Sequence, residues 1–355
     1  MIAETTRYRM SVLQQFRAVG IVHHVDGGTV WGSRRRTILR RDNGQWRPLG
    51  RFPLSLPRDF FGWNRPMARA SRADKCNLYV NSEGRVLGIR AHTAYSVGPG
   101  GRLTKLLEIQ GDCVLHRGIS EDTEGWTYFG EYFRNPQRAA VRIWRVSPDM
   151  QTHELAHEFA PRRIRHVHCV LRDPFDPEAL WVTVGDYAGE CYLLRTRDRF
   201  RSLESFGDGT QIWRAVVLFF TPDHVGWLTD SHLDQNHACR MDRGSHKLEV
   251  GERVPCSTWY GLTTTDGLHV AFTTVERGPA IQRNESVVLV SQDAYHWEEV
   301  GSYRKDAWWP PRLFKFGVIS CPSGPMASDD IYLSGEGLVG LDGVSLHVSV
   351  DRTGG

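Results

Sequence analysis

Short apolar segments recur along this chain at intervals of about fifty residues, and each is followed by a polar turn and two further strand-like stretches. The segments lie at residues 30–31, 78–80, 126–129, 180–182, 225–227, 269–272 and 331–333. Each interval is long enough for one antiparallel sheet of four strands. The pattern therefore predicts an all-β chain with the architecture of a seven-bladed β-propeller. Six or eight blades are the alternatives, because the last interval is longer than the others.

Later in most intervals, alternating or continuous apolar stretches predict a third strand, at residues 37–40, 141–145, 191–194, 287–290 and 345–348. Polar turns follow, and in three of them Asp149, Asp198 or Asp293 can accept hydrogen bonds from the turn backbone. The last interval ends before a fourth strand, and an open sheet edge promotes aggregation. We expect residues 8–13, which have strand-like composition, to supply this outer strand and close the ring.

No linker or low-complexity stretch divides the chain, so we expect one domain over residues 1–355. Seven segments are predicted to be inner strands lining the central channel, where propellers usually bind ligands. Nearly all of them carry His, Arg, Trp or Tyr, whereas a purely structural channel would carry small apolar residues. These segments are residues 21–24, 61–65, 115–118, 165–168, 211–214, 258–261 and 313–316.

Charge and composition exclude several classes of function. Forty-four basic and 41 acidic residues give a net charge of +3, too small and too dispersed for a nucleic-acid surface. No apolar stretch is long enough for a membrane span, and the N-terminal residues 1–7 contain no apolar leader core, so we expect a cytoplasmic protein. Seven cysteines without paired spacing predict reduced, buried thiols.

His166 and His168 are the first candidates for chemistry. Side chains alternate along a strand, so both imidazoles are expected on one face. Three interpretations are open: one ring bonds a backbone carbonyl while the other fills the channel, at least one is catalytic, or the pair ligates a divalent metal. Local spacing supplies no third metal ligand.

Other polar and aromatic residues are predicted around the same channel. His116 and Tyr260 join the histidine pair as candidate catalytic groups, and Glu131 is the candidate acid or base of a hydrolase. The residues expected to contact a substrate are Arg117, Tyr132, Asp186, Gln211, Trp213, Arg214, Asp230, Gln235, Asn236 and Trp259. Guanidinium groups suit a carboxylate and aromatic faces suit a sugar ring, so this set predicts a carbohydrate ligand bearing an acidic group.

The turn at residues 291–297, with Ser291, Asp293 and Trp297, resembles the Asp-box of BNR repeats in sialidase-like β-propellers. Ala294 stands where the short form of that motif has Gly. Roughly residues 110 to 245 are similar to bacterial BNR-like propeller proteins described as sialidase-like or glycosyl-hydrolase-like. The resemblance implies the propeller fold. The Phe-Arg-Ile-Pro motif of true sialidases is absent, which disfavours sialidase activity.

Seven-bladed polysaccharide lyases share this architecture, and they use His with Tyr or Arg to neutralise a uronate carboxylate and abstract a proton. By analogy of fold and residue type, the leading hypothesis is a β-elimination enzyme acting on a uronate-containing glycan. The alternatives are a sialidase-like hydrolase using Glu131 with Asp186 or Asp230, and a non-catalytic glycan-binding or scaffold propeller.

Overall fold

The computed structural model describes residues 7–56, 58–62, 64–308, 310 and 312–353. Within these residues the strands form seven antiparallel sheets of four strands each, so the predicted seven-bladed β-propeller is confirmed. By its internal contacts the chain divides into two compact units, described here in turn. Unit 2 comprises His23–Val216 and Pro322–Gly324, and unit 1 comprises Met1–Val22, Val217–Cys321 and Pro325–Gly355.

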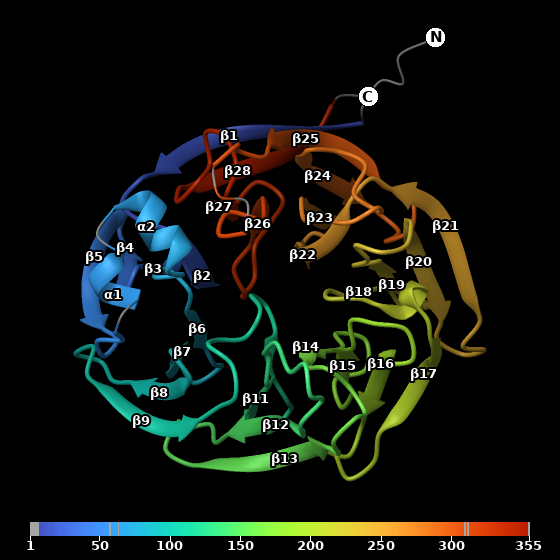
Figure 1. Ribbon diagram of the computed structural model, residues 1–355, viewed down its shortest axis with the longest axis horizontal. Helices are drawn as coiled ribbons and strands as arrows, with labels where there is room; N and C mark the ends of the chain where they lie inside the picture. The colour runs from blue at the N-terminus through green and yellow to red at the C-terminus, as the bar shows by residue number, and fades with distance from the viewer. Residues whose placement is uncertain (1–6, 57, 63, 309, 311, 354–355) are drawn as a thin grey trace. The chain divides into compact units, whose positions relative to one another are not determined.

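In unit 2, each sheet runs in chain order across its four strands (Figure 1). The first sheet contains β2 (Ile21–Asp26), β3 (Thr29–Arg34), β4 (Thr37–Asp42) and β5 (Gln45–Arg51). The second contains β6 (Asn77–Val80), β7 (Val86–Arg90), β8 (Thr93–Val97) and β9 (Leu103–Glu108). The third contains β10 (Ile119–Glu121), β11 (Thr127–Gly130), β12 (Val141–Val146) and β13 (His153–Phe159). The fourth contains β14 (Val167–Arg172), β15 (Leu180–Val184), β16 (Cys191–Thr196) and β17 (Glu204–Gly209), followed by the 3₁₀ turn η1 (Gln211–Trp213).

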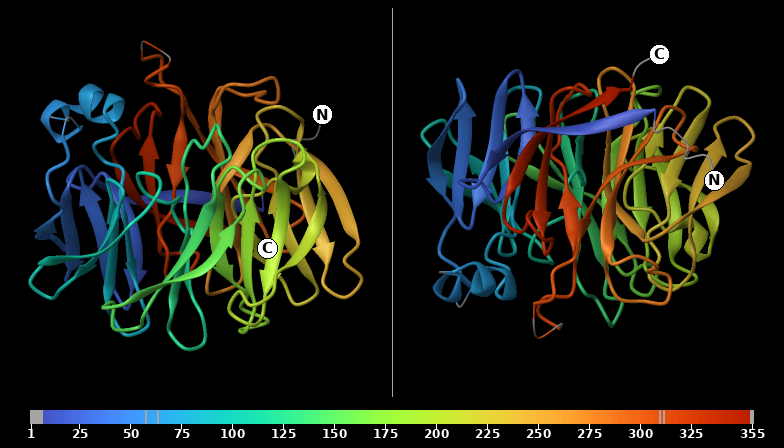
Figure 2. Two further views of the ribbon diagram at one scale, coloured as in Figure 1. Left: turned by 60° about the horizontal axis from the view of Figure 1, so that its bottom comes forward. Right: turned by 90° about the horizontal axis from the view of Figure 1, so that it is seen from above.

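Two short helices, α1 (Arg58–Phe61) and α2 (Arg65–Ala70), lie between the first two sheets of unit 2 in sequence. Figure 2 shows them at one end of these sheets. Asn64 caps α2 by accepting a hydrogen bond from the Met67 amide. None of the helices in the described part of the chain is long and apolar enough to span a membrane.

Unit 1 holds the other three sheets. The first contains β18 (Phe219–Phe220), β19 (His224–Leu228), β20 (Asn236–Asp242) and β21 (Leu248–Val254), and the second contains β22 (Ser257–Thr263), β23 (His269–Thr274), β24 (Glu285–Ser291) and β25 (Glu298–Arg304). The third has the order β1 (Tyr8–Phe16), β28 (Ser345–Arg352), β27 (Ile331–Glu336) and β26 (Val318–Ser320). The N-terminal strand therefore supplies the outer strand of the last blade, as predicted.

Burial falls from the early strands of a sheet to its last strand. All five residues of β15 are buried, whereas most of β13 is exposed. Both faces of the early strands are covered by neighbouring sheets, so these strands are apolar without alternation. Tyr128, Val141 and Ile143 of the third sheet share one core with Val170 and Val182 of the fourth. The contacts between these two sheets position the loops that carry the candidate site.

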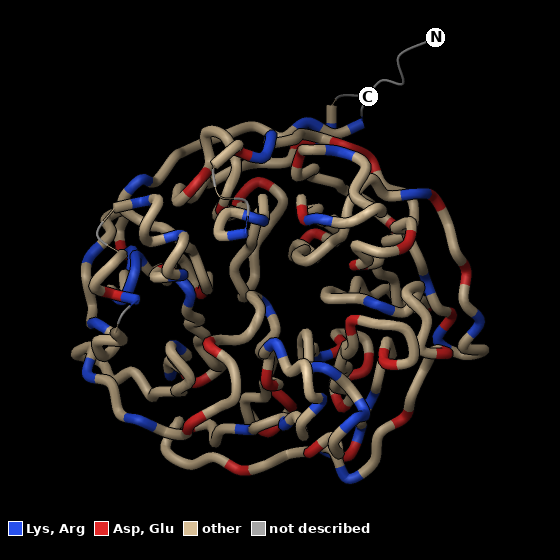
Figure 3. The backbone as a smooth tube through the Cα atoms, viewed as in Figure 1, with Lys and Arg blue, Asp and Glu red and all other residues tan. Residues whose placement is uncertain are grey.

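The turn chemistry predicted from the sequence is present. Asp149 accepts hydrogen bonds from the Ser147 hydroxyl and the Gln151 amide. Asp198 and Asp293 each accept a hydroxyl hydrogen bond from the residue two positions earlier in the chain. These turns join third strands to outer strands, so the aspartates are architectural. All seven cysteines are free, and Lys and Arg are interspersed with Asp and Glu along the chain (Figure 3).

Several of the predicted inner strands are wrong. Residues 115–118 and 313–316 lie in turns before β10 and β26, residues 211–214 include η1, and residues 61–65 join α1 to α2, with Trp63 outside the described residues. The recurring apolar segment 78–80 lies in β6, the first strand of its sheet, although residues 61–65 were predicted to precede it as the inner strand. The true first strands of these four sheets, β6, β10, β18 and β26, have only four, three, two and three residues and show no alternation, so the segments before them were mistaken for strands.

Candidate functional site

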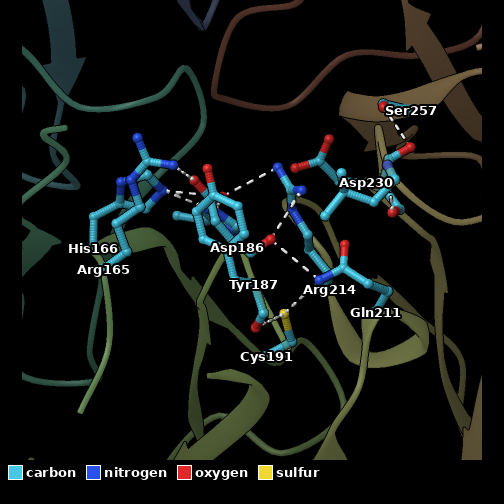
Figure 4. Close-up of polar contacts among 12 residues, drawn as sticks. Arg165, His166, Asp186, Tyr187, Cys191, Gln211, Arg214, Asp230 and Ser257 are labelled. Atoms are coloured by element: carbon cyan, nitrogen blue, oxygen red, sulfur yellow. Dashed lines mark hydrogen bonds and ion pairs between the residues drawn. The ribbon is translucent and has the colours of Figure 1, made fainter. Parts of the chain in front are cut away.

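Two imidazoles and a carboxylate meet beside the fourth sheet of unit 2 (Figure 4). His166 precedes β14, His168 is its second residue, and Asp186 follows β15. The pairing of β14 with β15 is irregular between Val167 and Cys169, next to the two histidines. The irregularity is typical of the bulges that re-aim side chains near functional sites.

The turn that delivers Asp186 requires glycine at position 185. Gly185 has a φ of +89°, and a Cβ atom at this position would lie 1.8 Å from the Glu190 carbonyl oxygen. An L-residue would therefore be both strained and in collision with the backbone. Glu190 completes the turn, because its Oε1 accepts hydrogen bonds from the amides of Asp186 and Tyr187 at 3.3 and 3.0 Å.

The three side chains form a compact triangle. The Nε2 atoms of His166 and His168 are 3.1 Å apart, and they lie 3.4 and 3.2 Å from Asp186 Oδ1. The three residues are 3%, 2% and 6% exposed. Both imidazoles point to one side, as expected from the sequence, although His166 lies just before β14.

Backbone carbonyls fix the tautomer of both rings. His166 Nδ1 lies 2.9 Å from the Phe133 carbonyl oxygen, and His168 Nδ1 lies 2.8 Å from the Ala215 carbonyl oxygen. A carbonyl oxygen only accepts hydrogen bonds, so we assign a proton to each Nδ1. In the neutral rings, each Nε2 then presents a lone pair toward Asp186.

Two arginines hold the carboxylate from other directions. Arg165 Nη1 lies 2.5 Å from Asp186 Oδ2, and Arg214 Nη2 lies 3.1 Å from Oδ1. We call Arg165, His166, His168, Asp186 and Arg214 the Asp186 cluster. Its two guanidinium charges exceed its single carboxylate charge, so the cluster is suited to attract an anion.

Burial would raise the pKa of Asp186, but the neighbouring imidazoles of His166 and His168 and the charge of Arg214 lower this pKa far below its usual range. Asp186 is therefore ionised at neutral pH. The pKa of His168 is lowered, chiefly by burial; the Asp186 carboxylate opposes this shift, and His166 and Arg214 add to it.

Two tyrosines border the cluster. The Tyr132 ring centroid lies 4.3 Å from that of His166. Tyr187 is 41% exposed, and the guanidinium carbons of Arg138 and Arg165 lie 5.5 Å from its ring centroid. These contacts give the cluster an aromatic, solvent-facing edge of the kind that sugar rings stack on.

The structure thus joins five residues predicted from the sequence: Tyr132, His166, His168, Asp186 and Arg214. Gln211 supports them, because its Nε2 donates to the Asp186 carbonyl oxygen at 3.1 Å. Trp213 is buried near Gly207, where a Cβ atom would approach its ring to 2.7 Å. We therefore assign Trp213 to packing.

Glu131 has a structural environment. Its Oε1 accepts hydrogen bonds from the Gln110 amide at 2.9 Å and the Trp144 indole at 3.2 Å. Its Oε2 accepts one from the Arg142 amide at 3.1 Å, and the residue is 1% exposed. Donors on both oxygens fix this carboxylate in place between strands.

His116 and Arg117 belong to a second group in unit 2. The His116 ring packs against His23 with centroids 5.4 Å apart. Arg117, in a left-handed conformation, donates to the Pro322 carbonyl oxygen at 2.5 Å. Next to His23, the His24 Nδ1 atom accepts a hydrogen bond from the Val80 amide at 3.3 Å.

The other predicted site residues lie in unit 1. Asp230 Oδ1 accepts a hydrogen bond from the Trp259 indole at 2.7 Å, and Trp259 lies against Tyr260. Asn236 is fully buried; its Oδ1 accepts from the Ser231 amide and its Nδ2 donates to the Ser231 carbonyl oxygen. It is a structural turn residue. The Gln235 side chain donates to the Asn236 and Val254 carbonyl oxygens.

Sequence reasoning missed four residues around the cluster: Arg165, Tyr187, Glu190 and Arg138. Arg138 and Glu190 form a two-pronged ion pair at 2.9 and 3.0 Å. Arg165 lies in the predicted inner strand 165–168, but it was not among the residues predicted for the site. Its position immediately before the histidine pair was the available signal.

No family model and no curated protein matches the sequence. Solved structures do match in fold. YCF48 bound to D1 peptide is 12% identical, with a TM-score of 0.53 over 98% of this chain and 96% of that one. The AfRom2 CNH domain is 11% identical, with a TM-score of 0.55 over 98% and 100% of the two chains.

A prolyl endopeptidase structure is 13% identical, with a TM-score of 0.51 over 99% of this chain and 51% of that one. At such low identity, these similarities support the β-propeller fold alone. They identify neither the Asp-box family nor a carbohydrate-active function. The chemistry must therefore be argued from the side chains of the site.

Proposed function

We propose that the protein is an enzyme that cleaves a uronate-containing oligosaccharide by β-elimination at the Asp186 cluster. The observation that carries this proposal is the convergence of two guanidinium groups and two imidazoles beside an exposed tyrosine. Arg165, whose side chain is 19% exposed, is suited to bind the substrate carboxylate. Tyr187 offers a face for the sugar ring.

The proposed reaction requires an electrophilic group and a base. Neutralising the uronate carboxylate makes the neighbouring C5–H bond more acidic, and Arg165 supplies positive charge for this purpose. The base is drawn from the adjacent pair His166 and Tyr132. It accepts the C5 proton while the C4–O bond breaks and then gives this proton to the departing oxygen, which leaves a C4=C5 double bond in one product and a hydroxyl group on the other.

A hydrolase mechanism has less support. A general acid must be protonated before the reaction, but the lowered pKa of Asp186 keeps this carboxyl ionised. Both Glu131 oxygens accept hydrogen bonds from fixed donors. Elimination does not require Asp186 or Glu131 to act as a protonated acid.

The test is incubation of the purified chain with a panel of uronate oligosaccharides. Elimination predicts an unsaturated uronate product that absorbs in the far ultraviolet and is lighter by one water than the corresponding hydrolysis product. Arg165→Gln is expected to raise KM at least tenfold, because it loses a charge-assisted contact worth about 1.5–3 kcal/mol. Arg163→Gln, on the same segment and exposed, is the matched control.

New reducing ends without an unsaturated product would show that the chain hydrolyses the glycan, and the elimination mechanism would be wrong. Glycan binding without any product, unchanged in Arg165→Gln, would contradict the proposal and favour the non-catalytic alternative.

A further inference from the structure

We propose that His166, His168 and Asp186 bind one divalent metal ion, with zinc the best match to these ligands. The first argument is the placement of protons. Both Nδ1 atoms donate to carbonyl oxygens, so the two Nε2 lone pairs and the ionised carboxylate face one another at 3.1–3.4 Å. Three converging acceptors repel one another unless a cation or a proton lies among them.

The spacing of these atoms suits a metal. Zinc binds imidazole nitrogen and carboxylate oxygen at about 2.0–2.2 Å, so neighbouring ligands of a tetrahedral ion lie about 3.3–3.5 Å apart. The three distances in the triangle are 3.1, 3.2 and 3.4 Å. A single ion can therefore contact all three atoms with small adjustments, leaving a fourth position for a water molecule or an anion.

The surroundings resemble the outer shell of a metal site. Metal-ligating histidines usually donate their other ring nitrogen to a backbone carbonyl or carboxylate, as both rings do here. Arg165 holds Asp186 Oδ2, and Oδ1 faces both imidazoles and the Arg214 guanidinium. The ligand pattern of two histidines and one carboxylate is one that catalytic zinc sites use.

The charges of Arg165 and Arg214 favour an anion as the fourth ligand of the metal ion. A dication beside two guanidinium groups leaves an excess of positive charge that an anionic fourth ligand would offset. If the proposed function holds, this ligand is the uronate carboxylate; this part of the inference rests on that function. With Nε2 of His166 bound to the metal, Tyr132 becomes the proton acceptor.

Metal binding is tested without any sugar. The full chain is stripped with a chelator, loaded with zinc, desalted and analysed for metal. We expect about one equivalent per chain, and at least a tenfold loss of affinity in His168→Gln. His153→Gln, an exposed histidine on β13, should retain the metal. X-ray absorption of the loaded protein should show two imidazole ligands.

Failure of the wild-type protein to retain zinc, or equal retention in His168→Gln, would overturn the inference. A proton is the alternative occupant, and nitrogen NMR of the imidazoles would then show a charged ring whose signals zinc does not change. Wild-type metal analysis decides the question even if the variant misfolds.

Activity assays separate this inference from the proposed function. Unsaturated product formed equally well by chelator-stripped protein would refute the inferred role of the metal as a ligand of the uronate carboxylate, and it would support the lyase activity. If the zinc-loaded protein forms no product from any uronate, the metal site stands and the proposed lyase activity is wrong. Tyr132→Phe should keep the metal while losing product formation.

Discussion

At the scale of single residues, buried histidines make the stability of the fold depend on pH. Burial, followed by the charge of Arg117, lowers the pKa of His24 from 6.5 to about 3. Between these values the unfolded chain takes up a proton that folded His24 does not, so stability falls as pH falls below 6.5. Above pH 6.5 this loss is absent.

We predict that His24→Asn reduces this acid sensitivity. At pH 5 the protonation of unfolded His24 costs the wild type about 2 kcal/mol relative to pH 7.5, and the variant lacks this cost. Asn keeps an acceptor for the Val80 amide. Urea unfolding at both pH values measures the difference. An equal loss of stability in both proteins would show that His24 is charged in the folded state or protected in the unfolded state.

Part of the candidate site was predicted from the pattern of residues in the sequence. The His166 and His168 side chains were expected on one face because strand alternation is local geometry. Arg165 was not expected, because an arginine that binds a buried carboxylate looks in sequence like its solvated neighbours Arg162 and Arg163. The third member of the triangle, Asp186, comes from the next strand, so only tertiary structure joins it to the histidines.

At the scale of elements, the turn between β15 and β16 positions the carboxylate of the site. We predict that Gly185→Ala destabilises the protein by at least about 2 kcal/mol and lowers its zinc affinity. The added Cβ atom combines strain at positive φ with a backbone collision. Equilibrium unfolding in urea and metal titration are the measurements.

The control for this prediction lies in the same turn. Gly189 has a φ of +87°, but a Cβ atom there would meet nothing within 4 Å. Gly189→Ala should therefore cost about 1 kcal/mol from backbone strain alone and leave metal binding unchanged. Equal effects of the two substitutions would mean that the collision at position 185 relaxes without displacing Asp186.

Element prediction succeeded where strands are long and their burial pattern is regular. β12, β16 and β24 were predicted from alternating or continuous apolar stretches of four or five residues. β18 has two residues, and its two phenylalanines carry no periodicity that separates them from a loop. Aromatic segments nearby, such as residues 211–214, were consequently assigned to the strand although they form a 3₁₀ turn.

At the scale of the whole molecule, counting strands predicted how the last sheet is completed. The final interval contains three strands, and the N-terminal segment was the remaining strand-like stretch. In unit 1, Tyr8 lies opposite Arg352 and Phe16 opposite Ser345 in the pairing of β1 with β28. Tyr8 also donates its amide hydrogen to Glu298 of β25. Residues 8–16 and 345–352 thus share one sheet, and the stability of this sheet depends on segments that are far apart in the sequence.

This pairing leads to a prediction for a chain lacking residues 1–16. Removing β1 exposes the edge of β28, so we expect Tm to fall by at least about 5 °C and the truncated chain to self-associate. Removing residues 1–6 leaves β1 whole and serves as the control. A synthetic peptide of Tyr8–Phe16 should restore Tm in proportion to the logarithm of its concentration once this exceeds its Kd. Calorimetry and light scattering follow both effects, and an unchanged Tm in the longer truncation would show that β1 covers the edge without stabilising the sheet.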